Sequence, residues 1–171
     1  MRSFSSSLLF LALLLVFLWA PDISRAELRP MTVTSGTGQA VEGDLVSVNG
    51  AIVKLWGVDA PDSGQTCMRL NGSSYDCFTA SKDALTRLIG ANTVDCHIRG
   101  TDSFGQQVGT CGVNGYDLAA MMVRDGWVLA YDNLSPHYDR LQGTAQARRA
   151  GLWAGYVEAP WLWRSQQVKR K

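Results

Sequence analysis

Hydrophobic and polar residues alternate from Gln39 onward in the manner of short β-strands. A strand at Ala40-Val41 is followed by two further strands, Leu45–Val48 and Ile52–Trp56. Between these two lies Asn49-Gly50, a dipeptide that readily adopts the left-handed backbone of a two-residue hairpin turn. The first part of the domain is therefore predicted to contain three strands, the second and third of which form a hairpin.

A second hairpin is predicted further along the chain. Residues 92–99 and 106–113 have strand-like patterns on either side of the turn-rich stretch Asp102–Gly105. If the hairpin is symmetric about this turn, paired positions have residue numbers that sum to 207. That register places Cys96 directly opposite Cys111.

Helical spacing of apolar residues appears in three other segments. The predicted helices are Phe78–Ile89 ending at Gly90, Asp117–Gly126, and Ser135–Gly151, which begins with a capping serine and a proline. Five strands with helices mainly late in the chain indicate an α+β, mainly β fold, in which helices cover a small barrel.

The N-terminus has the features of a secretory signal. Arg2 precedes 13 apolar residues, Leu8–Ala20, and Ser24-Arg25-Ala26 offers small residues for cleavage. We expect a signal peptide at 1–26, a linker at 27–38, one domain at 39–164 and a basic tail at 165–171. The protein is then secreted or periplasmic, with no stable membrane insertion; the alternative is a membrane anchor formed by an uncleaved N-terminal segment.

Charge argues against strong attraction to polyanions. The whole chain has 16 Lys+Arg and 15 Asp+Glu, a net charge of +1. Removing residues 1–26 takes away two basic residues and one acidic residue, which leaves 14 of each. A neutral chain creates little long-range field to steer nucleic acid toward it.

Export would let the four cysteines form disulfides. The hairpin register predicts Cys96–Cys111, and Cys67–Cys77 would then close a short polar loop. A zinc site is disfavoured because the sequence contains no C-x-x-C pair.

Carboxylates gather where predicted strands end. Glu42 and Asp44 flank Gly43, while Asp59 and Asp62 flank Ala60-Pro61. Converging carboxylates suit Ca²⁺ or Mg²⁺. The alternative is that Asp59 and Asp62 are turn residues that accept hydrogen bonds from their own backbone.

Several segments share their order and spacing with one known domain. They are Val41–Leu45, Val53–Asp62, Asp102–Gln106, Asp117–Trp127 and Gly151–Trp153. These segments resemble the V-x-D-G-D-T, I-R-L-x-G-I-D-A-P-E, D-x-Y-G-R, D-L-N-x-x-L-V-x-x-G-x-A and G-L-W motifs of staphylococcal-nuclease-like (thermonuclease) domains. The similarity covers Gln39–Arg164, and the cysteine positions resemble a secreted bacterial branch of the family.

The resemblance implies a five-stranded OB-type β-barrel with three helices, and Ca²⁺-assisted hydrolysis of phosphodiester bonds in DNA and RNA. By position, the Asp44 and Asp59 carboxylates and the Ala60 carbonyl would hold Ca²⁺. The catalytic positions are altered. Lys54 and Gln106 stand where the family has two phosphate-binding arginines, and Asp62 stands where it has a glutamate.

Each alteration weakens the chemistry that the family performs. Lys54 keeps the positive charge but lacks the planar fork of arginine, and Gln106 has no charge. Asp62 is one methylene shorter than glutamate, which moves its carboxylate away from the attacking water. Two hypotheses follow from these differences.

In the first hypothesis, the phosphodiesterase site is degenerate and its activity is weak or lost. The protein would then be a monomeric binding module, contacting single-stranded DNA or RNA weakly through the barrel face or the segment Pro160–Arg164. In the second, it is an active Ca²⁺-dependent endonuclease in which Lys54 takes the phosphate role with help from Arg99 or another nearby basic residue.

Overall fold

The structure is a computed structural model that describes residues 32–131 and 134–169. The predicted signal peptide, 1–26, and the first residues of the predicted linker lie outside this part of the chain. Within the described residues, no helix has the length and apolar character needed to cross a membrane.

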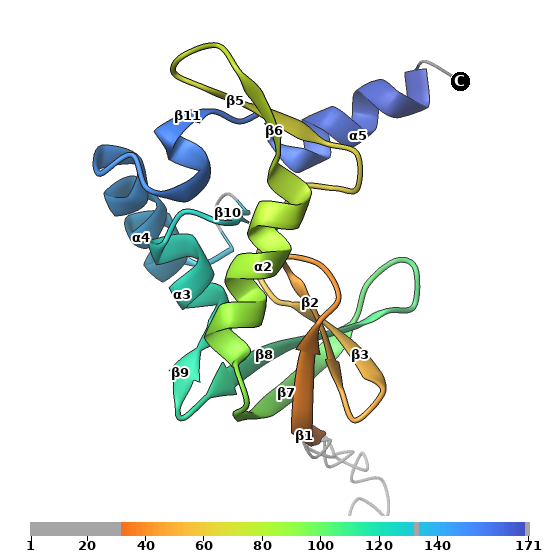
Figure 1. Cartoon of the computed structure of the whole chain (residues 1–171). Coiled ribbons are helices and arrows are strands. Elements are labelled where there is room, and N and C mark those ends of the chain that lie inside the picture. The colour runs from red at the N-terminus through yellow and green to blue at the C-terminus, as the bar shows by residue number, and fades with distance from the viewer. Residues whose placement is uncertain (1–31, 132–133, 170–171) are drawn as a thin grey trace, which may run out of the picture. The chain divides into compact units, whose positions relative to one another are not determined.

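Five strands form a closed barrel (Figure 1). They are β1 (Val33–Ala40), β2 (Leu45–Val48), β3 (Ala51–Leu55), β7 (Thr93–Thr101) and β8 (Gln107–Val113). Neighbouring strands follow the order β3-β2-β1-β7-β8, and parallel pairing of β3 with β8 closes the sheet. The short strand β9 (Tyr116–Asp117) extends the sheet beyond β8. The predicted five-stranded barrel is confirmed.

Both predicted hairpins are present. Asn49 and Gly50 have φ angles of 49° and 87°, which are the left-handed values that a tight turn between β2 and β3 requires. In the β7–β8 hairpin, Cys96 pairs with Cys111 as predicted. The register shifts by one residue between Ile98 and Gly100, so the simple symmetry fails only near the turn.

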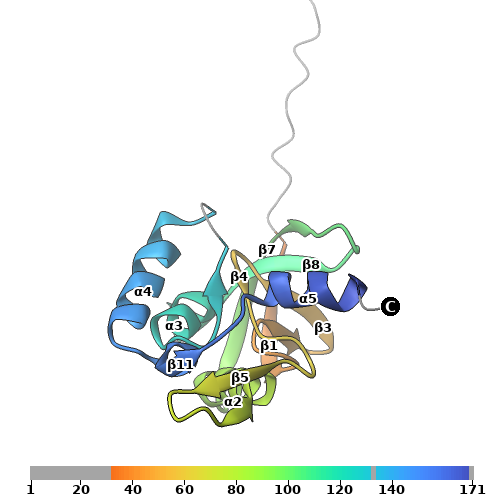
Figure 2. The same cartoon turned by 90° about the horizontal axis from the view of Figure 1, so that it is seen from above.

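Helices α2 (Cys77–Ile89), α3 (Leu118–Arg124) and α4 (Pro136–Ala147) confirm the three predicted helical segments. Figures 1 and 2 show α2 and α3 beside the barrel and α4 on the outer side of α3. The predicted end of the third helix at Gly151 is wrong. The chain leaves α4 with Arg149 at φ 51°, and a short 3-10 helix, η2 (Gly151–Ala154), follows.

The barrel interior and the inner faces of α2 and α3 form one hydrophobic core. Its fully buried side chains include Val46, Val53, Leu55, Leu85 and Met122. A smaller apolar cluster lies around Cys67, Cys77, Leu129 and Leu152.

Two expectations about irregular segments are corrected. The predicted linker 27–38 contains most of β1, because Val33–Thr37 pair with β7. The predicted polar loop between Cys67 and Cys77 contains a hairpin formed by β5 (Thr66–Arg69) and β6 (Ser74–Asp76). Strand β11 (Gly155–Tyr156) pairs with β5 and so fixes this hairpin in place.

A fourth α-helix, α5 (Pro160–Lys169), was not predicted. It takes in most of the segment expected to be a basic tail, 165–171, of which residues 170 and 171 lie outside the described range. In both Figure 1 and Figure 2, α5 lies on the same side of the molecule as β3. Strands β4 (Val58–Asp59) and β10 (Leu129–Ala130) pair with each other and complete the elements.

The N-terminal cap of α2 provides a stability test. The Asp76 carboxylate accepts hydrogen bonds from the backbone N–H and the hydroxyl of Thr79, at 3.0 and 2.6 Å. Replacing Asp76 with alanine is expected to lower the free energy of unfolding by about 1 kcal/mol at neutral pH. Urea unfolding of both proteins measures the difference.

This difference should depend on pH. The hydrogen bonds from Thr79 lower the pKa of Asp76 in the folded protein. The stabilisation is therefore present above the unfolded-state pKa and disappears as the pH falls through the lowered folded pKa. Asp76→Asn is the control, since asparagine caps helices well and does not titrate. Equal losses for Asp76→Asn and Asp76→Ala would contradict this account of the cap.

Candidate functional site

Acidic side chains from three consecutive parts of the chain converge at one end of the barrel. Asp44 lies directly before β2, Asp59 ends β4, and Asp62 follows three residues later. Asp44 and Asp59 are almost fully buried, with exposed fractions of 2% and 1%. Burying two carboxylates requires partners of opposite charge or hydrogen-bond donors.

Lys54 of β3 is the first such partner. Its Nζ atom lies 2.5 Å from Asp44 Oδ2 and 3.6 Å from Asp59 Oδ1. The backbone N–H of Ala60 also donates to Asp44 Oδ2, at 3.3 Å. The predicted site residues Asp44, Lys54, Asp59 and Ala60 are thus brought together by the strand ends.

Arg164 of α5 is the second partner. Its Nη2 atom lies 2.5 Å from Asp59 Oδ2. Its Nη1 atom lies 2.8 Å from Asp62 Oδ2 and 3.3 Å from Asp59 Oδ1. One guanidinium therefore spans Asp59 and Asp62, which is the planar, forked recognition that suits arginine. We refer to Asp44, Asp59, Asp62, Lys54 and Arg164 as the acidic centre.

The electrostatics of the acidic centre favour charged lysine. Burial lowers the pKa of Lys54, but the attraction and hydrogen bond of Asp44 and the attraction of Asp59 outweigh burial, so the pKa lies above its ordinary value. Burial raises the pKa of Asp62 against the opposing effect of Arg164. Burial also raises the pKa of nearby Glu42, with a further contribution from Asp44. A further ionised carboxylate is therefore unfavourable in the acidic centre.

A cleft of about 440 Å³ opens beside the acidic centre. Lys54, Asp62, Gln106 and Arg164 line it, so the three predicted catalytic positions share one cavity. The aromatic residues Trp56, Phe104 and Tyr131 also contribute to the cleft, and Phe104 is 93% exposed. The cleft thus combines two cationic side chains with aromatic surfaces.

Arg99, predicted as a possible helper of Lys54, has a different contact. Its guanidinium carbon lies 4.0 Å from the centre of the Trp56 ring. An Nη atom also donates to the Thr110 hydroxyl at 3.4 Å. Arg99 is thus in contact with a residue that lines the cleft.

The residues of the acidic centre do not fit a calcium ion in the arrangement observed. Calcium takes six to eight oxygen ligands that are free to face it. Here Asp44 is bound to Lys54, and both oxygens of Asp59 are bound to Arg164. Across the described residues, no three His, Cys, Asp or Glu side chains are grouped so that they could hold a metal.

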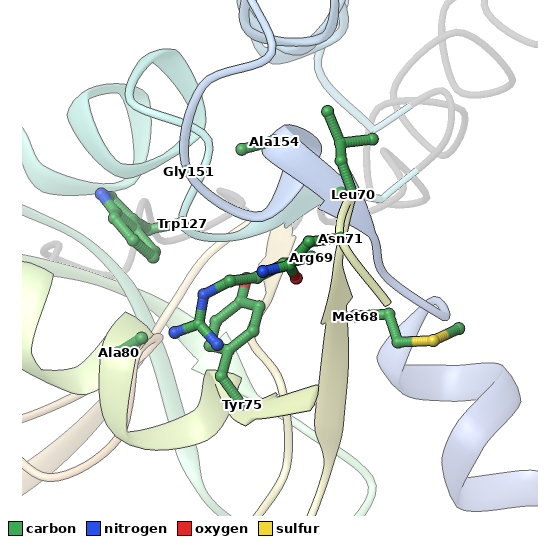
Figure 3. A pocket seen from close by; sticks show the side chains of 10 residues that line it. Met68, Arg69, Leu70, Asn71, Tyr75, Ala80, Trp127, Gly151 and Ala154 are labelled. Atoms are coloured by element: carbon green, nitrogen blue, oxygen red, sulfur yellow. The ribbon is translucent and has the colours of Figure 1, made fainter. Parts of the chain in front are cut away.

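A second cavity, of about 480 Å³, contains none of the predicted catalytic or metal-binding residues. It lies between the β5–β6 hairpin and η2, and Figure 3 shows Arg69, Tyr75 and Trp127 pointing into it. The Arg69 guanidinium lies 4.4 Å from the centre of the Tyr75 ring. The Arg69 guanidinium is therefore already engaged in a contact inside the protein.

Sequence reasoning missed the role of Arg164. Arg164 was expected only as the last residue of Pro160–Arg164, a segment that would contact nucleic acid, and residues 165–171 were expected to form a basic tail. In the structure Trp161 of this segment packs, with its ring centroid 5.3 Å from that of Tyr131. One signal in the sequence could have indicated this role. Arg164 directly follows a tryptophan-rich segment, and the aspartates at the predicted strand ends outnumber the basic residues near them in the sequence.

This chain is similar to known proteins. Residues 52–155 match the family model described as "Staphylococcal nuclease homologue". The chain is 31% identical over 139 residues to the protein named "Succinoglycan biosynthesis protein ExoI" of Rhizobium meliloti (strain 1021), covering 80% of this chain and 73% of that protein.

Plant proteins are also similar. Over 118 residues the chain is 30% identical to "Probable staphylococcal-like nuclease CAN3" and to "Probable staphylococcal-like nuclease CAN2", both of Oryza sativa subsp. japonica. These matches cover 67% of this chain and 29% of each rice protein. The chain therefore spans less than a third of the rice relatives that it matches.

Proposed function

This chain belongs to the staphylococcal nuclease homologue family, and we propose that it is a member with a degenerate phosphodiesterase site. Nucleases of this family are generally calcium-dependent, and their domains generally bind nucleic acid. In this protein, hydrolysis of DNA and RNA would be weak or lost, while binding of single-stranded nucleic acid would persist weakly.

The observation that carries the proposal is the internal pairing of the acidic centre. Asp44, Asp59 and Asp62 each contact Lys54 or Arg164 at 2.8 Å or less. A divalent ion would have to replace a protein cation before it could bind there. Metal binding at the buried Asp59 therefore also carries the free-energy cost of separating this carboxylate from Arg164.

The altered phosphate-binding positions support the same proposal. Lys54 is engaged with Asp44, and Gln106 is uncharged although it lines the cleft. Removing one preorganised group that stabilises developing charge costs about 2.7 to 4 kcal/mol of transition-state stabilisation in other enzymes. Two altered positions and a shortened acid can therefore suppress hydrolysis by orders of magnitude.

The cleft supports weak binding of single strands. The exposed ring of Phe104 can stack on a base, and Lys54 and Arg164 supply positive charge. The three aspartates cancel that charge locally, so the electrostatic part of the affinity should be small.

We also propose that the protein is exported. The apolar N-terminal sequence and the two disulfides, Cys67–Cys77 and Cys96–Cys111, support an oxidising compartment.

A cleavage assay tests the proposal. The protein without residues 1–26 is incubated with labelled single-stranded DNA and RNA, in Ca²⁺ or in chelator. We expect no more than a few-fold difference between these conditions. The triple variant Lys54→Arg, Asp62→Glu, Gln106→Arg, combined with Arg164→Gln, should gain at least tenfold in calcium-dependent cleavage.

The same assay has two informative failures. Rapid calcium-dependent cleavage by the unmodified protein would establish the alternative, an active endonuclease. The second failure is a quadruple variant that is folded by circular dichroism but shows no gain in cleavage. In that case the family's residue roles do not transfer to these positions. Fluorescence anisotropy with the same single strands measures binding separately from cleavage.

A further inference from the structure

Helix α5 reaches the acidic centre through one long side chain. Of the ten residues that the structure describes in α5, Pro160 is the one that is buried. Trp161 stacks on Tyr131, and the carbonyl of Glu158, just before the helix, accepts a hydrogen bond from Gln65 at 2.8 Å. The contacts of Arg164 with Asp59 and Asp62 are the polar link between α5 and the barrel end.

Arg164 supplies the positive charge beside Asp59 and Asp62. Asp59 is 1% exposed, and its other cationic partner, Lys54, is 3.6 Å away and sits closer to Asp44. Without Arg164, one ammonium would have to serve two buried carboxylates, and Asp62 would lose its ion pair. Such a centre would attract another cation from solution.

We propose that α5 is an intramolecular plug in which Arg164 serves as the resident cation of the acidic centre and excludes divalent ions from Asp59 and Asp62. This inference rests on the proposed function and adds regulation to it. Metal entry is controlled by a segment outside the barrel, 102 to 105 residues away in sequence from the aspartates.

Part of the plug is accessible to solvent. The Arg164 side chain is 39% exposed, and most of α5 is exposed or half-buried. Partly exposed ion pairs are weakened by salt and by competing ions. Binding of a divalent ion and release of α5 are linked equilibria. If release of α5 raises the affinity of the aspartates for the ion by some factor, the bound ion favours release of α5 by the same factor.

Terbium luminescence tests the plug directly. Tb³⁺ is titrated into the protein without residues 1–26, and its emission is excited through nearby tyrosine and tryptophan. We expect Arg164→Gln to bind Tb³⁺ at least tenfold more tightly than the unmodified protein. Arg124→Gln is the matched control, because Arg124 is 49% exposed and pairs with its neighbour Asp125, so its affinity should be unchanged.

A second variant keeps the test decisive if Arg164→Gln is unstable. Arg164→Lys retains the charge but cannot span two carboxylates with a planar fork, so an intermediate affinity is expected. Equal Tb³⁺ affinity in the unmodified protein, Arg164→Gln and Arg164→Lys would overturn the plug. That result would leave the proposed function intact, since the cleavage assay alone decides whether the unmodified protein hydrolyses nucleic acid.

Discussion

Replacing Lys54 with methionine is expected to lower the free energy of unfolding by about 3 to 5 kcal/mol at neutral pH. Lys54 Nζ lies 2.5 Å from an Asp44 carboxylate that is 2% exposed. Methionine keeps much of the side-chain volume but leaves Asp44 without its charged partner. Urea unfolding followed by circular dichroism gives the difference between the two proteins.

The loss should shrink in acid. Burial raises the pKa of Asp44, and among the described residues Lys54 is the cation that pairs with Asp44 and opposes this effect. A folded pKa above the unfolded value means that protonation stabilises the folded state. The destabilisation of Lys54→Met is therefore largest above the raised folded pKa and decreases as the pH falls through it.

Two further variants separate this effect from general damage. Lys54→Met combined with Asp44→Asn removes the buried charge and should recover a large part of the lost stability. Lys169→Met, on the exposed end of α5, should change stability by less than about 0.5 kcal/mol. A pH-independent loss in Lys54→Met would show that packing, not the uncompensated carboxylate, is responsible.

Removing the Cys96–Cys111 disulfide is expected to destabilise the protein by about 3 kcal/mol. The two cysteines are 15 residues apart and join β7 to β8 within the barrel, where both are buried. The crosslink stabilises the protein by restricting the unfolded chain. The double variant Cys96→Ala, Cys111→Ala removes it. Guanidinium unfolding of this double variant measures the effect.

The second disulfide gives an internal comparison. Cys67–Cys77 closes a loop of 10 residues, so its removal should cost slightly less, about 2.7 kcal/mol. It joins β5 to the first residue of α2, away from the barrel wall. If reduction of both disulfides left the unfolding midpoint unchanged, neither crosslink would contribute to stability and the argument for an oxidising compartment would weaken.

Local chemistry explains why much of the fold could be predicted. Asn49-Gly50 specifies its turn through its own backbone preferences, and Asp76, Asp117 and Ser135 cap the helices that follow them. The cross-strand register of Cys96 and Cys111 follows from the position of one turn. The order of strands and helices already indicated a small barrel, and the family resemblance implied the same five-stranded fold.

Elements that depend on distant partners were missed or misplaced. The first residues of β1 are strand because β7, about 60 residues later, pairs with them. The β5–β6 hairpin is fixed by β11, from the far end of the chain. Helix α5 has no strong apolar periodicity of its own, and its position depends on Tyr131 and the acidic centre.

The sequence by itself determined the order and chemical types of the residues at the strand ends, including the aspartates and the altered positions Lys54, Asp62 and Gln106. Only the tertiary structure decided that Arg164 pairs with Asp59 and Asp62. The physical reason is that buried charge must be neutralised by whichever cation the fold brings within contact distance. That cation comes from a helix more than 100 residues away, beyond the reach of any local pattern.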